Sequence, residues 1–363
     1  MTTADKPVDI LLIGLGSIGS IYAYLLEKSG KARVTAVARS NYSLYTTSGV
    51  TLETERFGKI ENWKPYRVVK SQAEALEGDF HYDFCLVTTK SLPDVLPTPE
   101  MLKECIASGK VGAWSLVQNG LNIEEDLYKA TKHLGTPIIS TCAWVLIQTS
   151  PDGETVYWRG LDKNVSGLYS PSSQPGKDHH RTFTSKEDAA LTQWKDLFES
   201  GGGHISLSDR QDSVRYQKNI WNCVWSSIQG LVRTTPACFL PLSDELTQPI
   251  RNLIHEVVTV GFTSGLLWEG MANHPQGGVV GNQQEVEDIA WTFIMASAKH
   301  ASGGHRMSLL IDIDMGRPIE VEVIVGSVLK VAREYNVATP LLDFAYLLLK
   351  GVQVELLKQQ KSR

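Results

Sequence analysis

The pattern Gly14-Leu15-Gly16-Ser17-Ile18-Gly19 stands between an apolar run, residues 8–13, and a helix-forming run, residues 20–28. In such a strand–turn–helix unit the glycines permit a tight turn and let the backbone approach a pyrophosphate. The helix N-terminus then offers free N–H groups and a positive dipole end to that anion. Residues 14–19 are therefore predicted to bind a dinucleotide. The alternative is a glycine-rich turn that binds nothing.

A second strand is expected at residues 33–38, and Arg39 stands at its end, followed by Ser40 and Asn41. Folds that bind NAD usually place an acidic residue there, about 20 residues past the glycines, to bind the ribose 2′-hydroxyl. A carboxylate repels a 2′-phosphate, whereas an arginine pairs with it, often through two N–H groups. Arg39 therefore favours NADP over NAD. The alternative is an ordinary surface arginine at a strand end.

Two further predicted strands end in residues suited to contact a nucleotide. The runs Val87-Thr88-Thr89-Lys90 and Val117-Gln118-Asn119-Gly120 both stand where a strand of a parallel sheet stops, which is the edge at which ligands bind. Lys90 is predicted to reach a cofactor phosphate or ribose, and Asn119 to donate and accept near the nicotinamide. The alternatives are a solvated lysine and an ordinary Asn-Gly turn.

Polar residues also interrupt the apolar patterns of the second half of the chain. Lys218, Asn222 and Ser226 are spaced four residues apart in a helical segment and are expected to share one face. Such groups amid tryptophans need partners, so the face is either a cleft wall or a solvated stripe. Further along stand Ser308 and Glu320. Glu320 falls in the first turn of a predicted helix, where it is either a functional acid or a complement to the helix dipole.

The elements that must position these residues change type along the chain. Up to residue 207 strands and helices alternate, which predicts a parallel sheet with helices on both faces. From residue 208 onward long helical patterns replace strands. We therefore predict an α/β Rossmann-type dinucleotide-binding domain over residues 1–207 and an all-α domain over residues 208–363. The ligand cleft is expected between them.

The expected strands are residues 8–13, 33–38, 84–88, 113–117, 137–147, 155–158, 165–169 and 204–207, the last three being short. The expected helices are residues 20–28, 93–108, 123–133, 185–200, 211–232, 242–269, 283–301, 319–335 and 340–358. Residues 170–184 and 271–281 are predicted to be loops because they are rich in Ser, Pro, Gly and Asn.

Composition excludes several classes of function. The 363 residues carry a net charge of −5, which gives no case for nucleic acid or for an anionic membrane surface. No apolar run reaches the ~18 residues that span a bilayer, and no signal-peptide pattern precedes the first strand. The five cysteines and nine histidines show no ligand spacing. We therefore expect reduced thiols, a cytoplasmic location and no metal site.

Taken in order, these motifs resemble the ketopantoate reductase (2-dehydropantoate 2-reductase) family along nearly the whole chain. The first shared features are the glycine-rich turn, the arginine after strand two, and strand ends that read V-T-x-K and Asn-Gly. Further on come a helix with K-x-x-x-N-C, a serine in S-x-x-x-D-I, and a glutamate twelve residues after that serine. The resemblance implies NADP as cofactor, a 2-keto acid as substrate and a possible homodimer, with substrate binding and dimerisation in the helical half.

Carried over by position, the resemblance makes Lys218 the catalytic lysine and Glu320 the acid near the substrate hydroxyl. Two positions depart from the family: Ser226 stands where a substrate-contacting Asn is usual, and His305 where Asn is frequent. Both fall in the expected substrate pocket. Substrate binding is assigned to Asn119, Asn222, Ser226 and Ser308, and cofactor binding to Gly14, Leu15, Gly16, Ser17, Ile18, Gly19, Arg39, Lys90 and Asn119.

The implied reaction is reduction of ketopantoate to pantoate by NADPH, a step that feeds pantothenate synthesis. The alkoxide formed by hydride transfer needs a positive group beside it and then a proton. Lys218 would supply both as general acid, with a pKa lowered by partial desolvation. Two alternatives stay open. One is a paralogue that reduces another 2-keto acid or a secondary-metabolite carbonyl; the other is a non-catalytic NADP-binding redox sensor.

Overall fold

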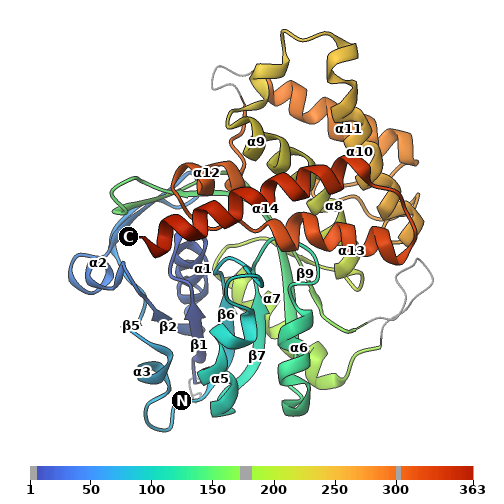
Figure 1. Cartoon of the computed structure of the whole chain (residues 1–363). Helices are drawn as coiled ribbons and strands as arrows, with labels where there is room; N and C mark the ends of the chain where they lie inside the picture. Colours follow the sequence, from blue (N-terminus) through green and yellow to red (C-terminus); the bar gives the residue numbers. More distant parts are fainter. Residues whose placement is uncertain (1–5, 172–181, 300–303, 363) are drawn as a thin grey trace.

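The computed structural model describes residues 6–171, 182–299 and 304–362 of the chain. The N-terminal half is a sheet with helices packed against it, and the C-terminal half is helical (Figure 1). This is the Rossmann-type α/β fold with an all-α second half that the sequence predicted. The change from strands to helices lies between β10 (Ile205–Leu207) and α8 (Gln211–Trp221).

The parallel part of the sheet has the strand order β5–β2–β1–β6–β7–β8. In β1, Ile10 and Leu12 join the apolar cluster around α1 and α7, whereas Leu11 and Ile13 join the cluster that continues into the helical half. Burial on both faces explains why these strands read as apolar runs in the sequence. Their bounds are β1 Val8–Ile13, β2 Ala32–Val37, β5 Arg67–Val69, β6 Tyr82–Val87, β7 Val111–Leu116 and β8 Ile138–Thr149.

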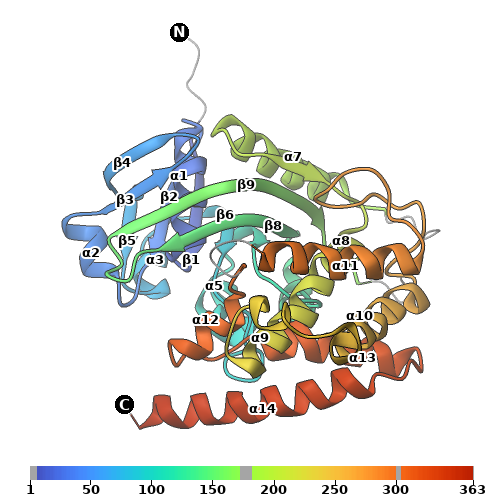
Figure 2. The ribbon, with the colours of Figure 1, turned by 90° about the horizontal axis from the view of Figure 1, so that it is seen from above.

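A long antiparallel hairpin, β8 with β9 (Thr155–Leu168), continues the same sheet beyond β7 (Figure 2). The prediction of two short strands here was wrong, because β9 is continuous through an exposed stretch that hides the alternation between its ends. β9 also pairs with β10 and with β3 (Val50–Thr54), which in turn pairs with β4 (Gly58–Trp63). The sequence did not predict β3, β4 or β5, since these strands are short and β4 is largely exposed.

Helices near the predicted ranges 20–28, 123–133 and 185–200 are present, the short helices α2 and α3 were not predicted, and residues 93–108 differ from the prediction. There the expected helix is wrong in its first part, because Pro97 and Pro99 restrict the chain and α4 begins only at Thr98. Thr184 caps α7 in a capping box with Glu187. The bounds are α1 Ser17–Lys28, α2 Tyr42–Thr47, α3 Gln72–Leu76, α4 Thr98–Met101, α5 Lys103–Ser108, α6 Glu125–Thr131, the 3₁₀ turn η1 Lys132–Leu134 and α7 Ser185–Ser200.

In the second half, two of the predicted long helices contain a π-helical turn. After α8 come the π turn η2 (Asn222–Ser226) and α9 (Ser227–Val232); the π turn η4 (Glu322–Gly326) precedes α13 (Ser327–Glu334). The remaining elements are η3 Pro236–Phe239 (3₁₀), α10 Asp244–Ser264, α11 Gln283–Ala298, α12 Ser308–Asp314 and α14 Pro340–Lys361. Most of the predicted loop 170–184 and the end of the predicted helix 283–301 lie outside the described residues. Within the described part of the chain, no helix combines the length and apolarity needed to cross a bilayer.

Candidate active site

The glycine-rich turn between β1 and α1 has the geometry of a phosphate-binding loop. Gly14 has φ of 110°, and a Cβ there would lie 2.8 Å from the backbone nitrogen of Thr89. A Cβ at Gly19 would lie 2.1 Å from the carbonyl oxygen of Gly14, so both positions require glycine. Gly16 caps α1, and a Cβ there would meet no heavy atom within 4 Å. The loop is therefore open where a pyrophosphate would approach the helix N-terminus, and it fits a dinucleotide.

The other residues of this turn contact either the apolar cluster around α1 or the end of β8. Leu15 is buried, and Ile18 packs beside it in the apolar cluster around α1. The Ser17 hydroxyl lies 2.5 Å from that of Thr149, at the end of β8. The tip of the β8–β9 hairpin thus lies next to the turn, a neighbour that the sequence did not predict because it expected short strands here.

Arg39 lies at the carboxyl end of β2 and is exposed. On the neighbouring strand β5, the carbonyl of Val69 accepts a hydrogen bond of 2.9 Å from the backbone N–H of Ala38, which places Lys70 beside Arg39 along the sheet edge. The Lys70 ammonium lies 5.0 Å from the centroid of the Tyr42 ring, just after Arg39 in the chain. Sequence reasoning missed Lys70, since β5 itself was not predicted.

Lys218 on α8 reaches the end of β7. Its Nζ donates a hydrogen bond of 2.6 Å to Oδ1 of Asn119, and both side chains are half-buried. Burial is the main cause that lowers the pKa of Lys218 below its ordinary value, and the charge of Arg215 adds to it; Cys142 and Glu320 act in the opposite direction. The expected lowering of this pKa is thereby confirmed. An ammonium held this way can donate a proton near neutral pH.

Glu320 is buried just before η4. Its Oε1 accepts a hydrogen bond of 3.0 Å from the backbone N–H of Ser91, in the turn after β6. Burial raises the pKa of Glu320 to about 7, with a further contribution from Asp312; the Ser91 hydrogen bond and the charges of Lys90 and Lys218 oppose it. Glu320 and Lys218 are thus close enough to perturb each other's pKa, as the sequence-based placement of both at one site requires.

Lys90 joins the sheet edge to the helical half. Its ammonium forms an ion pair with Asp312 of α12, whose carboxylate also pairs with Nη2 of Arg317 at 2.9 Å. Asp312 is buried, whereas the Lys90 side chain keeps 34% of its surface exposed. In the sequence Asp312 is the acid of the S-x-x-x-D-I motif, but sequence reasoning gave it no role of its own and did not predict α12.

Lys218 and Asn222 differ from Ser226 in burial, and that the three share one face stays a prediction. The π turn η2 begins at Asn222 and ends at Ser226, so both residues lie in the widened part of the helix. Asn222 is half-buried like Lys218, whereas Ser226 is fully buried and its hydroxyl has no hydrogen-bond partner among the described residues. Ser308 is exposed as the first residue of α12, and His305 is exposed shortly before it.

The structure therefore brings together Lys218 and Asn119 by direct contact, with Glu320 and Lys90 near them. No group of three His, Cys, Asp or Glu side chains suited to a metal occurs within residues 6–171, 182–299 and 304–362. A phosphate loop at the carboxyl edge of a Rossmann-type sheet, faced by a lysine from a helical half, is typical of two-domain NAD(P)-dependent oxidoreductases.

The chain belongs to the ketopantoate reductase PanE/ApbA family. The family model "Ketopantoate reductase PanE/ApbA" matches residues 10–169, and the model of its C-terminal part matches residues 211–353. The family comprises NAD(P)-dependent reductases of 2-keto acids.

Individual relatives are distant but cover the whole chain. The protein YDL144C of Saccharomyces cerevisiae, described as uncharacterized, is 25% identical over 97% of this chain and 95% of its own. The crystal structure of 2-dehydropantoate 2-reductase from Methylococcus capsulatus has a TM-score of 0.72 at 22% identity, covering 96% of this chain and 98% of that one. D-mandelate dehydrogenase with NADH and anilino(oxo)acetate has a TM-score of 0.69 at 17% identity, covering 96% and 99%. These two structures share the fold of this chain.

Proposed function

We propose that this chain is an NADPH-dependent oxidoreductase that reduces a 2-keto acid, with ketopantoate to pantoate as the first candidate reaction. The observation that carries the proposal is the hydrogen bond of 2.6 Å between Lys218 and Asn119 at the carboxyl edge of the sheet, beside the buried Glu320. An ammonium at this edge would polarise the carbonyl of a substrate bound next to a nicotinamide.

Each residue of the site then has a chemical task. NADPH, when bound, supplies a hydride to the carbonyl carbon of the substrate. Lys218 donates a hydrogen bond to the carbonyl oxygen and then transfers its proton to that oxygen, and its lowered pKa makes the transfer easier near neutral pH. Asn119 holds the ammonium in place. Glu320 accepts a hydrogen bond from a substrate hydroxyl or donates one, because its pKa of about 7 makes both forms available.

The remaining polar residues are proposed as substrate contacts. Asn222 stands one turn after Lys218 and is half-buried. The Ser226 hydroxyl is buried and has no hydrogen-bond partner in the described part of the chain, and a substrate oxygen would supply one. Ser308, exposed at the start of α12, would take the substrate carboxylate.

NADP is the proposed cofactor because two cations end the neighbouring strands where the ribose is recognised, and the residue at the end of β2 is an arginine in place of the usual acid. Arg39 and Lys70 end neighbouring strands, and Lys70 leans toward the chain that follows Arg39. An arginine and a lysine attract a 2′-phosphate, whereas a ribose 2′-hydroxyl gains little from them. Lys90 is proposed to reach the cofactor from the end of β6, in exchange with its ion pair to Asp312.

We further propose that residues 1–207 form the NADP-binding domain and residues 208–363 the domain for substrate binding and dimerisation. In α14, Phe344, Leu347, Leu348 and Val354 are exposed and recur at helical spacing, which suits burial against a second copy. A cytoplasmic location and a role in pantothenate synthesis belong to the same proposal.

A second candidate is reduction of another 2-keto acid. Ser226 and His305 depart from the residues that the ketopantoate reductase family usually has, and the structurally similar D-mandelate dehydrogenase was solved with anilino(oxo)acetate. A non-catalytic redox sensor is less well supported, since a sensor needs neither the Lys218–Asn119 hydrogen bond nor a buried Glu320.

The test is NADPH oxidation followed at 340 nm across a panel of 2-keto acids, including ketopantoate and 2-ketoisovalerate. A site that hydrogen-bonds a substrate hydroxyl rejects an analogue without it, by as much as ~10⁴-fold. Ketopantoate should therefore exceed 2-ketoisovalerate by orders of magnitude in kcat/KM. Turnover of a bulkier ketone without turnover of ketopantoate would favour the second candidate. Turnover of none, with NADPH bound, would favour the sensor.

A further inference from the structure

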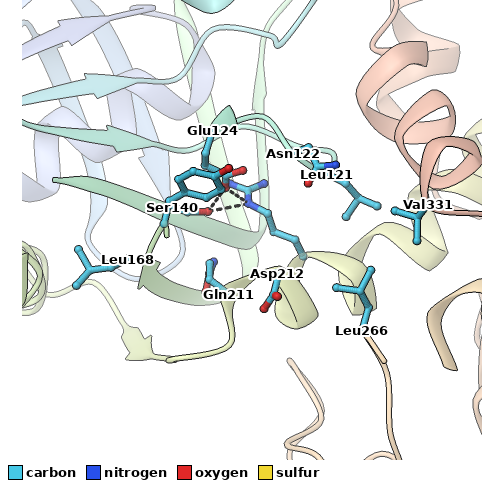
Figure 3. A pocket seen from close by; sticks show the side chains of 11 residues that line it. Leu121, Asn122, Glu124, Ser140, Leu168, Gln211, Asp212, Leu266 and Val331 are labelled. Carbon is cyan, nitrogen blue, oxygen red and sulfur yellow. Dashed lines mark hydrogen bonds and ion pairs between the residues drawn. The ribbon is translucent and has the colours of Figure 1, made fainter. Parts of the chain in front are cut away.

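A buried ion pair between Arg215 and Glu124 lies next to the turn that carries Asn119, the residue that accepts the hydrogen bond from Lys218. Arg215 precedes Lys218 by three residues on α8, and its side chain is 4% exposed, as is that of Glu124. The Nε atom of Arg215 lies 2.5 Å from Oε1 of Glu124 and donates to the Ser140 hydroxyl at 2.7 Å. The Ser140 hydroxyl in turn donates a hydrogen bond to Glu124. Figure 3 shows the side chains of Ser140 and Glu124 lining one cavity.

The other end of the Arg215 guanidinium holds the turn that carries Asn119. Its Nη1 donates to the carbonyl oxygen of Gln118 at 2.9 Å and to that of Gly120 at 3.1 Å. These are the two residues on either side of Asn119. One guanidinium therefore fixes the backbone on both sides of the residue that accepts the hydrogen bond from Lys218.

The same turn is held on its far side by the helical half. The backbone N–H of Leu121 donates to the carbonyl of Val323 in η4 at 2.8 Å, and a Cβ at Gly120 would lie 2.5 Å from that of Val323. These contacts join the turn to η4 but not to α8. Arg215 links the turn to α8 through its hydrogen bonds to Gln118 and Gly120. On that helix Arg215 lies three residues before Lys218, which corresponds to a rise of about 4.5 Å.

We propose that Arg215, oriented by Glu124 and Ser140, is a positioning residue that sets the geometry between Lys218 and Asn119 from behind the site. The inference rests on the function proposed above, in which Lys218 delivers the proton. Arg215 joins the two elements that contribute the two partners of that hydrogen bond. Without the forked Arg215 donor the turn is no longer held to α8, and Asn119 no longer holds the ammonium where the carbonyl oxygen is protonated.

Two variants of Arg215 separate the effect of its hydrogen-bond geometry from the effect of its charge. Lysine keeps the charge but offers a single point of attachment, so R215K cannot reproduce hydrogen bonds to Ser140 and to both carbonyls. R215Q removes the charge as well. The groups that act on the Lys218 charge are Arg215 on its own helix, Cys142 on β8 and Glu320 before η4.

Arg210 offers a matched control. It is a buried arginine that caps α8, and its guanidinium stacks over Trp268 at 4.9 Å from the ring centroid. R210K thus makes the same change at the start of the same helix. Protein stability is measured for each variant by thermal unfolding, and kcat is expressed per mole of folded enzyme.

In R215K, kcat for the keto acid should fall by about 10²-fold, the scale that a 1 Å misplacement produces, with the dissociation constant of NADPH unchanged. R210K should keep its kcat. As the pH rises through the lowered pKa of Lys218, kcat falls because the ammonium loses its proton. The pH at which kcat falls should be higher in R215Q than in the parent protein, because removal of a neighbouring positive charge favours the ammonium form of Lys218. In R215K, which keeps the charge, this pH should be unchanged. Normal kcat per folded R215K enzyme, or equal losses in R210K, would overturn the proposal and leave Arg215 a purely structural residue.

A readout without substrate separates this proposal from the proposed function. The titration of Lys218 Nζ is followed by NMR in lysine-selectively ¹⁵N-labelled protein, with K218R to assign the signal. A raised Lys218 pKa in R215Q but not in R210Q, together with loss of the Asn119 hydrogen bond in R215K, supports the positioning role even if no keto acid is reduced. Identical Lys218 signals in all variants would overturn it even if the parent enzyme is active.

Discussion

The raised pKa of Glu320 makes the stability of the protein depend on pH in a predictable way. Its carboxyl group is 6% exposed, and burial raises its pKa from 4.5 to about 7. The folded protein therefore binds a proton at this site more tightly than the unfolded chain does. The stabilisation is fully present below pH 4.5 and is lost as pH rises through the folded pKa. We expect Glu320→Gln, which cannot ionise, to lack this contribution.

The size of the effect follows from the shift. A difference of about 2.5 pKa units at about 1.4 kcal/mol per unit gives a maximum of about 3 kcal/mol. Nearly all of this stabilisation is lost between pH 4.5 and pH 8, because that interval contains both the unfolded and the folded pKa of the Glu320 carboxyl group. The free energy of unfolding of E320Q, minus that of the parent protein, should therefore rise by about 3 kcal/mol over this interval.

The assay is urea unfolding at half-unit pH steps, followed by tryptophan fluorescence, on the parent protein, E320Q and Glu334→Gln. Glu334 is exposed near the end of α13, so its replacement is an isosteric control. Because only differences between variants are compared, other titrating groups cancel. If E320Q and the parent protein show parallel pH dependence, the carboxyl group of Glu320 is not a buried acid with a raised pKa.

Three further outcomes are expected. Lys218→Ala should reduce kcat by ~10² to 10⁴-fold, the range for loss of a general acid, while NADPH still binds in a fluorescence titration; near-normal turnover would assign the proton to another group. The parent protein should prefer NADPH to NADH in kcat/KM by about 1–3 kcal/mol, a preference that Arg39→Asp reverses or abolishes and Lys70→Ala weakens. Equal kinetics with both cofactors would refute that assignment. Ser226→Ala should raise KM for the keto acid without changing NADPH affinity, and an unchanged KM would remove Ser226 from the substrate pocket.

The Rossmann unit was predictable because its signals are local. The glycine spacing needs only six residues, and strands buried on both faces appear as apolar runs in the sequence. The assignment of Asn119 and Lys218 to one site followed from general rules about where parallel strands end and from the family resemblance, but their hydrogen bond, between positions 99 apart, was not predicted. These signals can be recognised in the sequence without knowledge of the tertiary structure.

Other features depend on tertiary contacts and left no local signal. The π turn at Asn222–Ser226 follows a helical sequence with nothing to mark an added residue. Arg215 and Glu124 are charged, and charged residues usually lie at the surface, so nothing in the sequence indicates that they are buried against each other. Lys70 was missed for a different reason: its strand, Arg67–Val69, is three residues long.

The pairing of β3 with β9 imposes an order on folding of the nascent chain. Thr51 pairs with Thr155, so β3 cannot gain this neighbour until about a hundred further residues have been made. Trp63 of β4, whose ring packs edge to face against Tyr24 of α1, shares the same delay, because β4 is held in the sheet by β3. At a synthesis rate of about 5–20 residues per second, the face of α1 that carries Tyr24 waits roughly 5–20 s on the ribosome for β4 to be held in the complete sheet. Slower translation between these two strands lengthens the period in which that face is open to aggregation or to chaperones.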